Sequence, residues 1–155
     1  MKLSCMKYSG AVCVLLSAFV TAGNTALALD YVSVAESSAI LYDSPSLKGK
    51  KLFVINRFTP LEKVVNLEHW IKVRDSSGGL AWIERRAVSD KHYVVVKAAL
   101  GTVRQAPEPN APVVFHVAQK VAIESLGING GGWIKARHQD GSTGFIKSIE
   151  VWGAD

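Results

Sequence analysis

Apolar and polar residues alternate over short stretches of the chain after its first 28 residues. Val32 and Val34 alternate with other residue types, and so do the apolar positions of the tryptophan-led stretch at 70–74. A period of two is typical of a strand with one buried face, and these stretches are rich in β-branched and aromatic residues. Residues 29–155 nowhere sustain the period of about 3.6 residues that marks an amphipathic helix. The pattern predicts an all-β fold of short strands.

Residues that favour turns separate these stretches. The segments 75–79 and 139–142 join Asp or Ser to Gly, which supplies the positive φ angles of tight hairpins. Residues 107–112 contain three prolines, which lack a backbone N–H, so this segment is predicted to be a loop.

The strand pattern occurs twice in the same order. The matching pairs, 62 or 63 positions apart, are Tyr31 and Tyr93, Pro45 and Pro107, Phe53 and Phe115, Glu62 and Glu124, Trp70 and Trp133, and Trp82 and Phe145. The offset changes within three consecutive glycines at 130–132, where a loop would accept one extra residue. The repeat predicts two tandem small barrels, at residues 29–90 and 91–155.

The first 28 residues have a different character from the repeat. Lys2 and Lys7 precede an apolar run from Ala11 to about Ala22, and small residues follow at 26–28. This order is typical of a cleavable secretory signal, and the run is shorter than the roughly 20 residues of a spanning helix. We expect residues 1–28 to be removed and the protein to be periplasmic or extracellular, with no stable membrane anchor after cleavage. A retained anchor is the alternative.

Composition narrows the function classes further. The whole chain is 48% apolar and 20% charged, as expected of a globular protein. Cleavage would leave 127 residues without cysteine, which excludes a disulfide, a thiolate nucleophile and a Cys-containing metal site. The remaining 16 basic and 13 acidic residues give a net charge of +3, which is too low to favour nucleic acid as a partner.

Catalytic and metal-binding patterns are missing from the sequence. The four histidines lack ligand spacing, and no Gly-x-Ser-x-Gly elbow is present. Glu62 and Glu124 recur, but neither has the second carboxylate that a glycosidase needs. We therefore expect no catalytic residues, no metal and no cofactor, and not an enzyme.

The tryptophan-led strands carry the candidate binding residues. If the apolar positions of these strands point inward, an aromatic and two basic residues share each outer face. These residues are Trp70, Lys72 and Arg74 in the first copy, and Trp133, Lys135 and Arg137 in the second. Tyr42 and Arg104 lie in segments expected to border these faces. An indole beside two cations suits an apolar ligand with carboxylates. In the alternative interpretation each Trp covers one end of its barrel.

Four other aromatic residues are expected to be core. They are Phe53, Phe115, Trp82 and Phe145.

The Trp-Ile-Lys-(Val/Ala)-Arg strand, the Gly-containing hairpin and the aromatic-Ile pair that follows it resemble the distal hairpin of bacterial SH3-like domains. The segment Thr102-Val103-Arg104-Gln105-Ala106-Pro107 is similar to their opening element, and residues 39–45 match it with Tyr42 in the place of Arg. The resemblance covers about residues 31–90 and 92–152 and implies a small five-stranded barrel, occurring twice. It also implies an exported protein that binds peptidoglycan or peptides. Ala81 departs from the usual Gly, and Glu84, Arg86, Lys147 and Ile149 replace the proline and tyrosine of polyproline-binding SH3 domains.

Together these features predict an exported, non-enzymatic tandem binding module at the cell envelope. The expected partner is peptidoglycan or an envelope protein or peptide. The alternative is a structural or protein-interaction role, in which the aromatic faces are buried against a partner protein or the other barrel.

Overall fold

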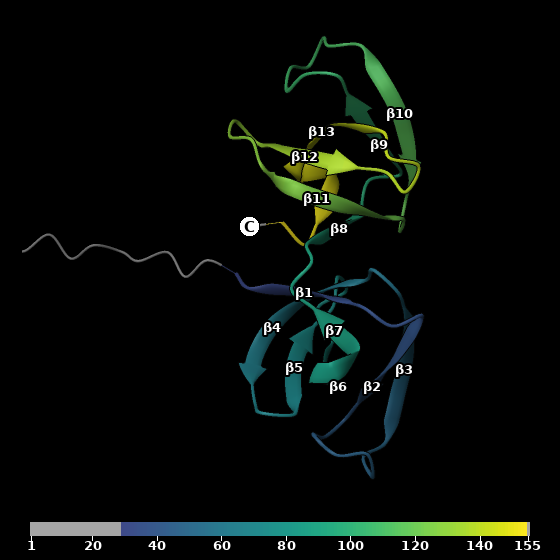
Figure 1. Ribbon diagram of the computed structural model, residues 1–155, viewed down its shortest axis with the longest axis vertical. Helices are drawn as coiled ribbons and strands as arrows, with labels where there is room; N and C mark the ends of the chain where they lie inside the picture. Colours follow the sequence, from purple (N-terminus) through teal and green to yellow (C-terminus); the bar gives the residue numbers. More distant parts are fainter. Residues whose placement is uncertain (1–28, 155) are drawn as a thin grey trace, which may run out of the picture.

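The computed structural model describes residues 29–154 as two β domains joined by a short connection (Figure 1). The predicted signal at residues 1–28 lies outside the described residues. Within residues 29–154, no helix has the length and apolar character that a membrane crossing requires.

The first domain is an antiparallel sheet of seven strands, curled around its own core. Its strands are β1 (Tyr31–Val34), β2 (Ser38–Tyr42), β3 (Lys51–Asn56), β4 (Pro60–Asn66), β5 (Trp70–Arg74), β6 (Leu80–Glu84) and β7 (Val88–Ser89). They lie in the order β3-β2-β6-β5-β4-β1-β7, and a 3₁₀ turn, η1 (Arg85–Ala87), precedes the last strand.

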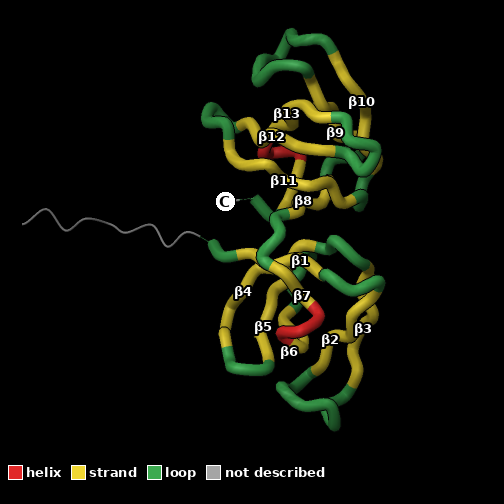
Figure 2. Tube along the Cα trace, viewed as in Figure 1, coloured by secondary structure: helices red, strands yellow, loops and turns green. Residues whose placement is uncertain are grey.

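The second domain repeats this arrangement. Its strands are β8 (Tyr93–Val96), β9 (Leu100–Arg104), β10 (Val113–Ala118), β11 (Ala122–Ile128), β12 (Trp133–Arg137), β13 (Thr143–Lys147) and β14 (Val151–Trp152), with η2 (Ser148–Glu150) before β14. The order β10-β9-β13-β12-β11-β8-β14 matches that of the first sheet strand for strand. Figure 2 shows the dominance of strand and loop in both domains. The predicted all-β fold and the duplication are therefore confirmed.

Each domain has more strands than the five that the family resemblance implies. The first strand of each copy inserts beside the fourth, and the two-residue last strand pairs with it on the other side. These short pairings extend each sheet by two strands without adding a new layer.

Alternation along the strands produces two separate apolar cores. In β5, Ile71 and Val73 are buried while Trp70, Lys72 and Arg74 are only half-buried. Val32, Val34, Leu61 and Ile83 join them in the first core. The second core is built by Val94, Val96, Ile123, Ile134 and Ile146.

The two barrels meet along β1 and the connection to β8. All four residues of β1 are buried: Val32 and Val34 lie in the first core, and the ring of Tyr31 contacts Trp152 of the second barrel edge-on at 5.4 Å. In the other direction, Phe58 stacks on Tyr93 with ring centroids 4.4 Å apart. Each barrel thus covers a tyrosine of the other.

The predicted core aromatics are largely wrong. Phe53 is 61% exposed, and its neighbour Leu52 packs on the core. Phe115 is half-buried against the second core. Trp82 and Phe145 are half-buried on the outer face, since the inward positions beside them are taken by Ala81, Ile83, Gly144 and Ile146.

Candidate functional site

The outer face of the first barrel gathers aromatic residues from three neighbouring strands. In the β5–β6 register Lys72 lies opposite Trp82, and in the β2–β6 register Tyr42 lies opposite Trp82. Trp70 lies two residues before Lys72 on β5, so both side chains point to the same face of the sheet. We call Tyr42, Trp70, Lys72 and Trp82 the aromatic face. Three of its members were predicted from the sequence, and Trp82 was not.

The aromatic face has a defined internal geometry. The rings of Tyr42 and Trp70 meet edge-to-face, with centroids 5.3 Å apart and an interplanar angle of 89°. Lys72 Nζ lies 5.9 Å from the centroid of the Trp82 ring, within the range of a cation–π contact. Tyr42 is only 4% exposed, whereas the two indoles are half-buried. The buried tyrosine therefore fixes Trp70, and the indoles are the groups that a ligand can reach.

Charged residues border this face at η1. Glu84 lies opposite Trp70 in the β5–β6 register, and Arg86 Nε donates to its carboxylate at 2.8 Å. The hydrogen bond and the charge of Glu84 raise the pKa of Arg86. A hollow of about 350 Å³ opens here, lined by Glu68, His69, Glu84, Arg85 and Arg86. The border thus offers both a carboxylate and guanidinium groups.

Arg74 and Arg137 do not belong to free basic faces. Arg74 Nη1 donates to both carboxylate oxygens of Glu62, at 2.8 and 2.9 Å. Arg137 makes a two-bond pair with Glu124, from Nε at 3.0 Å and from Nη2 at 3.2 Å. The recurrence of both glutamates with both arginines is the sequence signal that could have revealed these cross-strand pairs.

The second barrel's outer face is more closed than the first. Trp133 is 7% exposed, and Lys147 Nζ lies 5.8 Å from the centroid of its indole ring. Arg104 takes the place of Tyr42, and its Nη1 donates to the carbonyl of Ala111 at 2.8 Å. Lys135 is exposed. Trp70 is half-buried, whereas Trp133 is buried, so the expectation of an indole exposed on the outer face is wrong for Trp133.

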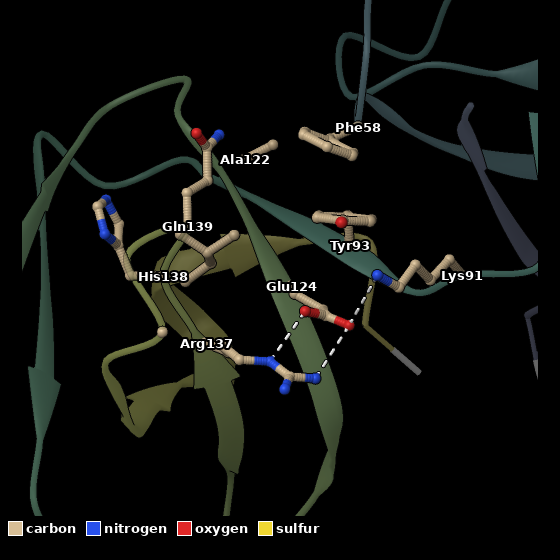
Figure 3. Close-up of a pocket in the computed structure, with 10 residues that line it drawn as sticks. Phe58, Lys91, Tyr93, Ala122, Glu124, Arg137, His138 and Gln139 are labelled. Atoms are coloured by element: carbon tan, nitrogen blue, oxygen red, sulfur yellow. Dashed lines mark hydrogen bonds and ion pairs between the residues drawn. The ribbon is translucent and has the colours of Figure 1, made fainter. Parts of the chain in front are cut away.

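A further hollow of about 450 Å³ lies beside the contact between the barrels (Figure 3). Tyr93, Glu124 and Arg137 are neighbours across β8, β11 and β12 and form one wall. Phe58 of the first barrel lines it, together with Lys91 and the hairpin residues His138, Gln139 and Gly141. Sequence reasoning missed this hollow because its wall combines residues from both copies.

Possible metal ligands do not cluster in the described part of the chain. No group of three or more His, Cys, Asp and Glu side chains there is placed to hold a metal ion.

Two small antiparallel barrels with the same strand order define the chain as a tandem β-domain protein. The family model described as bacterial SH3 domain matches residues 35–90 and 97–153. The chain therefore belongs to the bacterial SH3 domain family, with two tandem copies. No curated protein matches it significantly.

Solved structures show distant similarity. NlpC2 from Trichomonas vaginalis has 11% identity and a TM-score of 0.37, covering 80% of this chain and 48% of that one. NlpC1 from Trichomonas vaginalis has 13% identity and a TM-score of 0.37, covering 89% and 50%. An NlpC/P60 family protein from Bacillus cereus ATCC 10987 has 10% identity and a TM-score of 0.37, covering 78% and 55%. The chain spans about half the length of these structures.

Proposed function

We propose that this protein is a non-enzymatic binding module that acts outside the cytoplasm, at the cell envelope, and binds peptidoglycan or its peptides. The aromatic face of the first barrel carries the proposal. It supplies two half-buried indoles, a buried tyrosine that fixes one of them, and Lys72 between them. Family membership as a bacterial SH3 domain supports a binding role.

The chemistry of the face fits a ligand with both apolar and acidic parts. Half-exposed indole rings provide apolar contact area at little conformational cost, and Lys72 supplies a cation for a carboxylate. Sugar rings and peptide stems of the cell wall present this combination.

The first barrel is the main binder in this proposal. Trp70 is half-buried and open to a ligand, whereas its counterpart Trp133 is nearly covered. Lys135 remains exposed on the second barrel and provides a weaker contact. Arg74 and Arg104 hold strands and loops in place, because their side chains donate within their own barrel, and Arg137 does not contribute to this face because it pairs with Glu124.

The experiment is sedimentation of the purified chain with cell-wall sacculi. Trp70→Ala should weaken binding by about 1–3 kcal/mol, the scale of an aromatic anchor. Lys72→Gln should weaken it less, and Lys97→Gln, which changes an exposed lysine of the second barrel, serves as the matched control. Thermal unfolding of each variant separates lost binding from lost folding. Binding that survives Trp70→Ala, or that is absent from the wild type, would reject the proposal.

A protein partner is the second candidate function. The observation that favours it is on the edge strand β3, where Phe53 and Val54 are 61% and 69% exposed. β3 has only β2 as a neighbour in its sheet, so its outer side can accept another strand. Capture of a protein by the wild type but not by Val54→Lys, together with no sedimentation on sacculi, would favour this candidate.

A further inference from the structure

The hollow between the barrels differs from its counterpart in the first repeat. In the first barrel, Tyr31, Glu62 and Arg74 form the same cross-strand row, and the Glu62 side chain is 11% exposed, against 16% for Glu124. In the second barrel the row opens into about 450 Å³, a volume in the range of small-ligand sites. The row of Tyr, Glu and Arg therefore follows from the duplication of the sequence, whereas the hollow beside the row in the second barrel does not.

Two of the residues that line this hollow, Phe58 and Lys91, differ from their counterparts in the other copy. Phe58 stands where the second copy has Lys120, and both have a positive φ, of 69° and 66°. A bulky side chain rarely adopts this left-handed backbone, and here it is held by stacking on Tyr93. Lys91 stands where the first copy has Leu29. The hollow therefore combines a row of residues that both copies share with two residues that differ between them.

The charges of the wall leave one cation in excess. Glu124 accepts from Arg137 and lies 3.3 Å from Lys91 Nζ (Figure 3). Burial alone would raise the pKa of Glu124, but the hydrogen bonds from Arg137 and Lys91 outweigh it and lower the pKa. Glu124 is thus ionised at neutral pH and cancels only one of the two positive charges.

Hydrogen-bond donors remain after this pairing. A guanidinium carries five N–H groups, and Arg137 directs only Nε and one Nη2 N–H at Glu124. The N–H groups of Nη1 and the second one of Nη2 form another fork, which matches a planar carboxylate. The Arg137 and Lys91 side chains are 44% and 61% exposed, so an incoming ligand can reach them.

We propose that this hollow is a second binding site, which takes a small ligand with a free carboxylate, such as the C-terminal end of a short peptide. Arg137 and Lys91 bind the carboxylate. Ala122 and the paired rings of Phe58 and Tyr93 contact the apolar part of the ligand. Because the walls come from both barrels, the bound ligand bridges them. The proposal is independent of binding at the aromatic face.

The test is a nuclear magnetic resonance titration of the purified chain with acetyl-dialanine and with its C-terminal amide. The acid should shift the backbone amides of Lys91 and residues 138–141 and bind about tenfold more tightly than the amide, because the amide lacks the charge-assisted bonds. Lys91→Gln should weaken binding of the acid by about twofold to fivefold, the effect of one exposed charged contact. Lys97→Gln, at an exposed lysine elsewhere on the second barrel, should change nothing.

A further variant tests whether the acid binds in this hollow and not at the aromatic face. Phe58→Asn introduces an uncharged residue that accepts the positive φ at this position, and it should weaken binding of the acid because the apolar wall is lost. The shifts that the acid causes at residues 138–141 should disappear in this variant. Equal binding of acid and amide, equally tight binding of inorganic phosphate, or shifts centred on Trp70 would overturn the proposal.

Discussion

Phe53 and Phe115 show how the same residue at matching places in a repeat can have different roles. Phe115 packs on the second core, and the centroid of its ring lies 5.4 Å from the centroid of the His138 ring. The residue at the place of His138 in the first copy is Asp75, whose carboxylate accepts from Ser77 and Gly79 within its own turn. The first copy therefore has no imidazole to place beside Phe53, which stays exposed.

This difference predicts unequal stability effects. Phe53→Ala should change the free energy of unfolding by less than about 0.5 kcal/mol, as is usual for an exposed side chain. Phe115→Ala should cost about 2 kcal/mol, below the range for a fully buried phenylalanine because Phe115 is only half-buried. Urea unfolding of both variants checks the prediction. Equal losses would show that Phe53 is covered in solution.

At the scale of the element, the strands could be predicted from the sequence. The direction in which several side chains point could not. Ile71 and Val73 point inward as alternation predicts, because β5 is regular. Alternation fails at β3, where the register shift turns Leu52 toward the core. The covering of Trp133 by Lys147 depends on the pairing of β12 with β13. Bulges and cross-strand neighbours arise from pairing, which a single strand's sequence does not specify.

The absence of a side chain at Gly144 allows β13 and β9 to approach each other closely. A Cβ built on Gly144 would lie 2.6 Å from the carbonyl oxygen of Arg104 and 2.6 Å from Val103 Cγ1. Gly144→Ala should therefore destabilise the protein by about 1–3 kcal/mol, the cost of overpacking against a backbone that must move. The first copy has Ala81 at the matching place, and Ala81→Gly should cost up to about 1 kcal/mol for the greater freedom of glycine. Thermal unfolding measures the stability of both variants. If Gly144→Ala does not change the stability, the two strands can move apart at little cost.

At the scale of the molecule, the two barrels share a contact that neither copy makes alone. Phe58 with Tyr93 and Tyr31 with Trp152 are ring contacts between barrels, and Lys63 joins Asp30 of its own barrel to Asp90 of the connection, at 2.5 and 3.9 Å. A Cβ on Gly153 would come within 2.9 Å of Pro60 Cβ, so the C-terminal segment packs closely on the first barrel. Barrels of about 60 residues bury little surface by themselves, so this contact adds a significant share of the stability.

The contact predicts that destabilising one barrel will loosen the other. Ile134→Val removes a methylene group from the second core, at a fully buried position, and should cost about 0.5–1.5 kcal/mol. Hydrogen exchange should then be faster at slowly exchanging core amides of the first barrel, such as Ile71, as well as at those of the second. Adding Phe58→Lys, which removes the stack on Tyr93, should confine the effect of Ile134→Val to the second barrel. If hydrogen exchange in the first barrel does not respond to Ile134→Val while Phe58 is present, the two barrels unfold independently. A ligand that bridges the barrels could not then couple their stabilities.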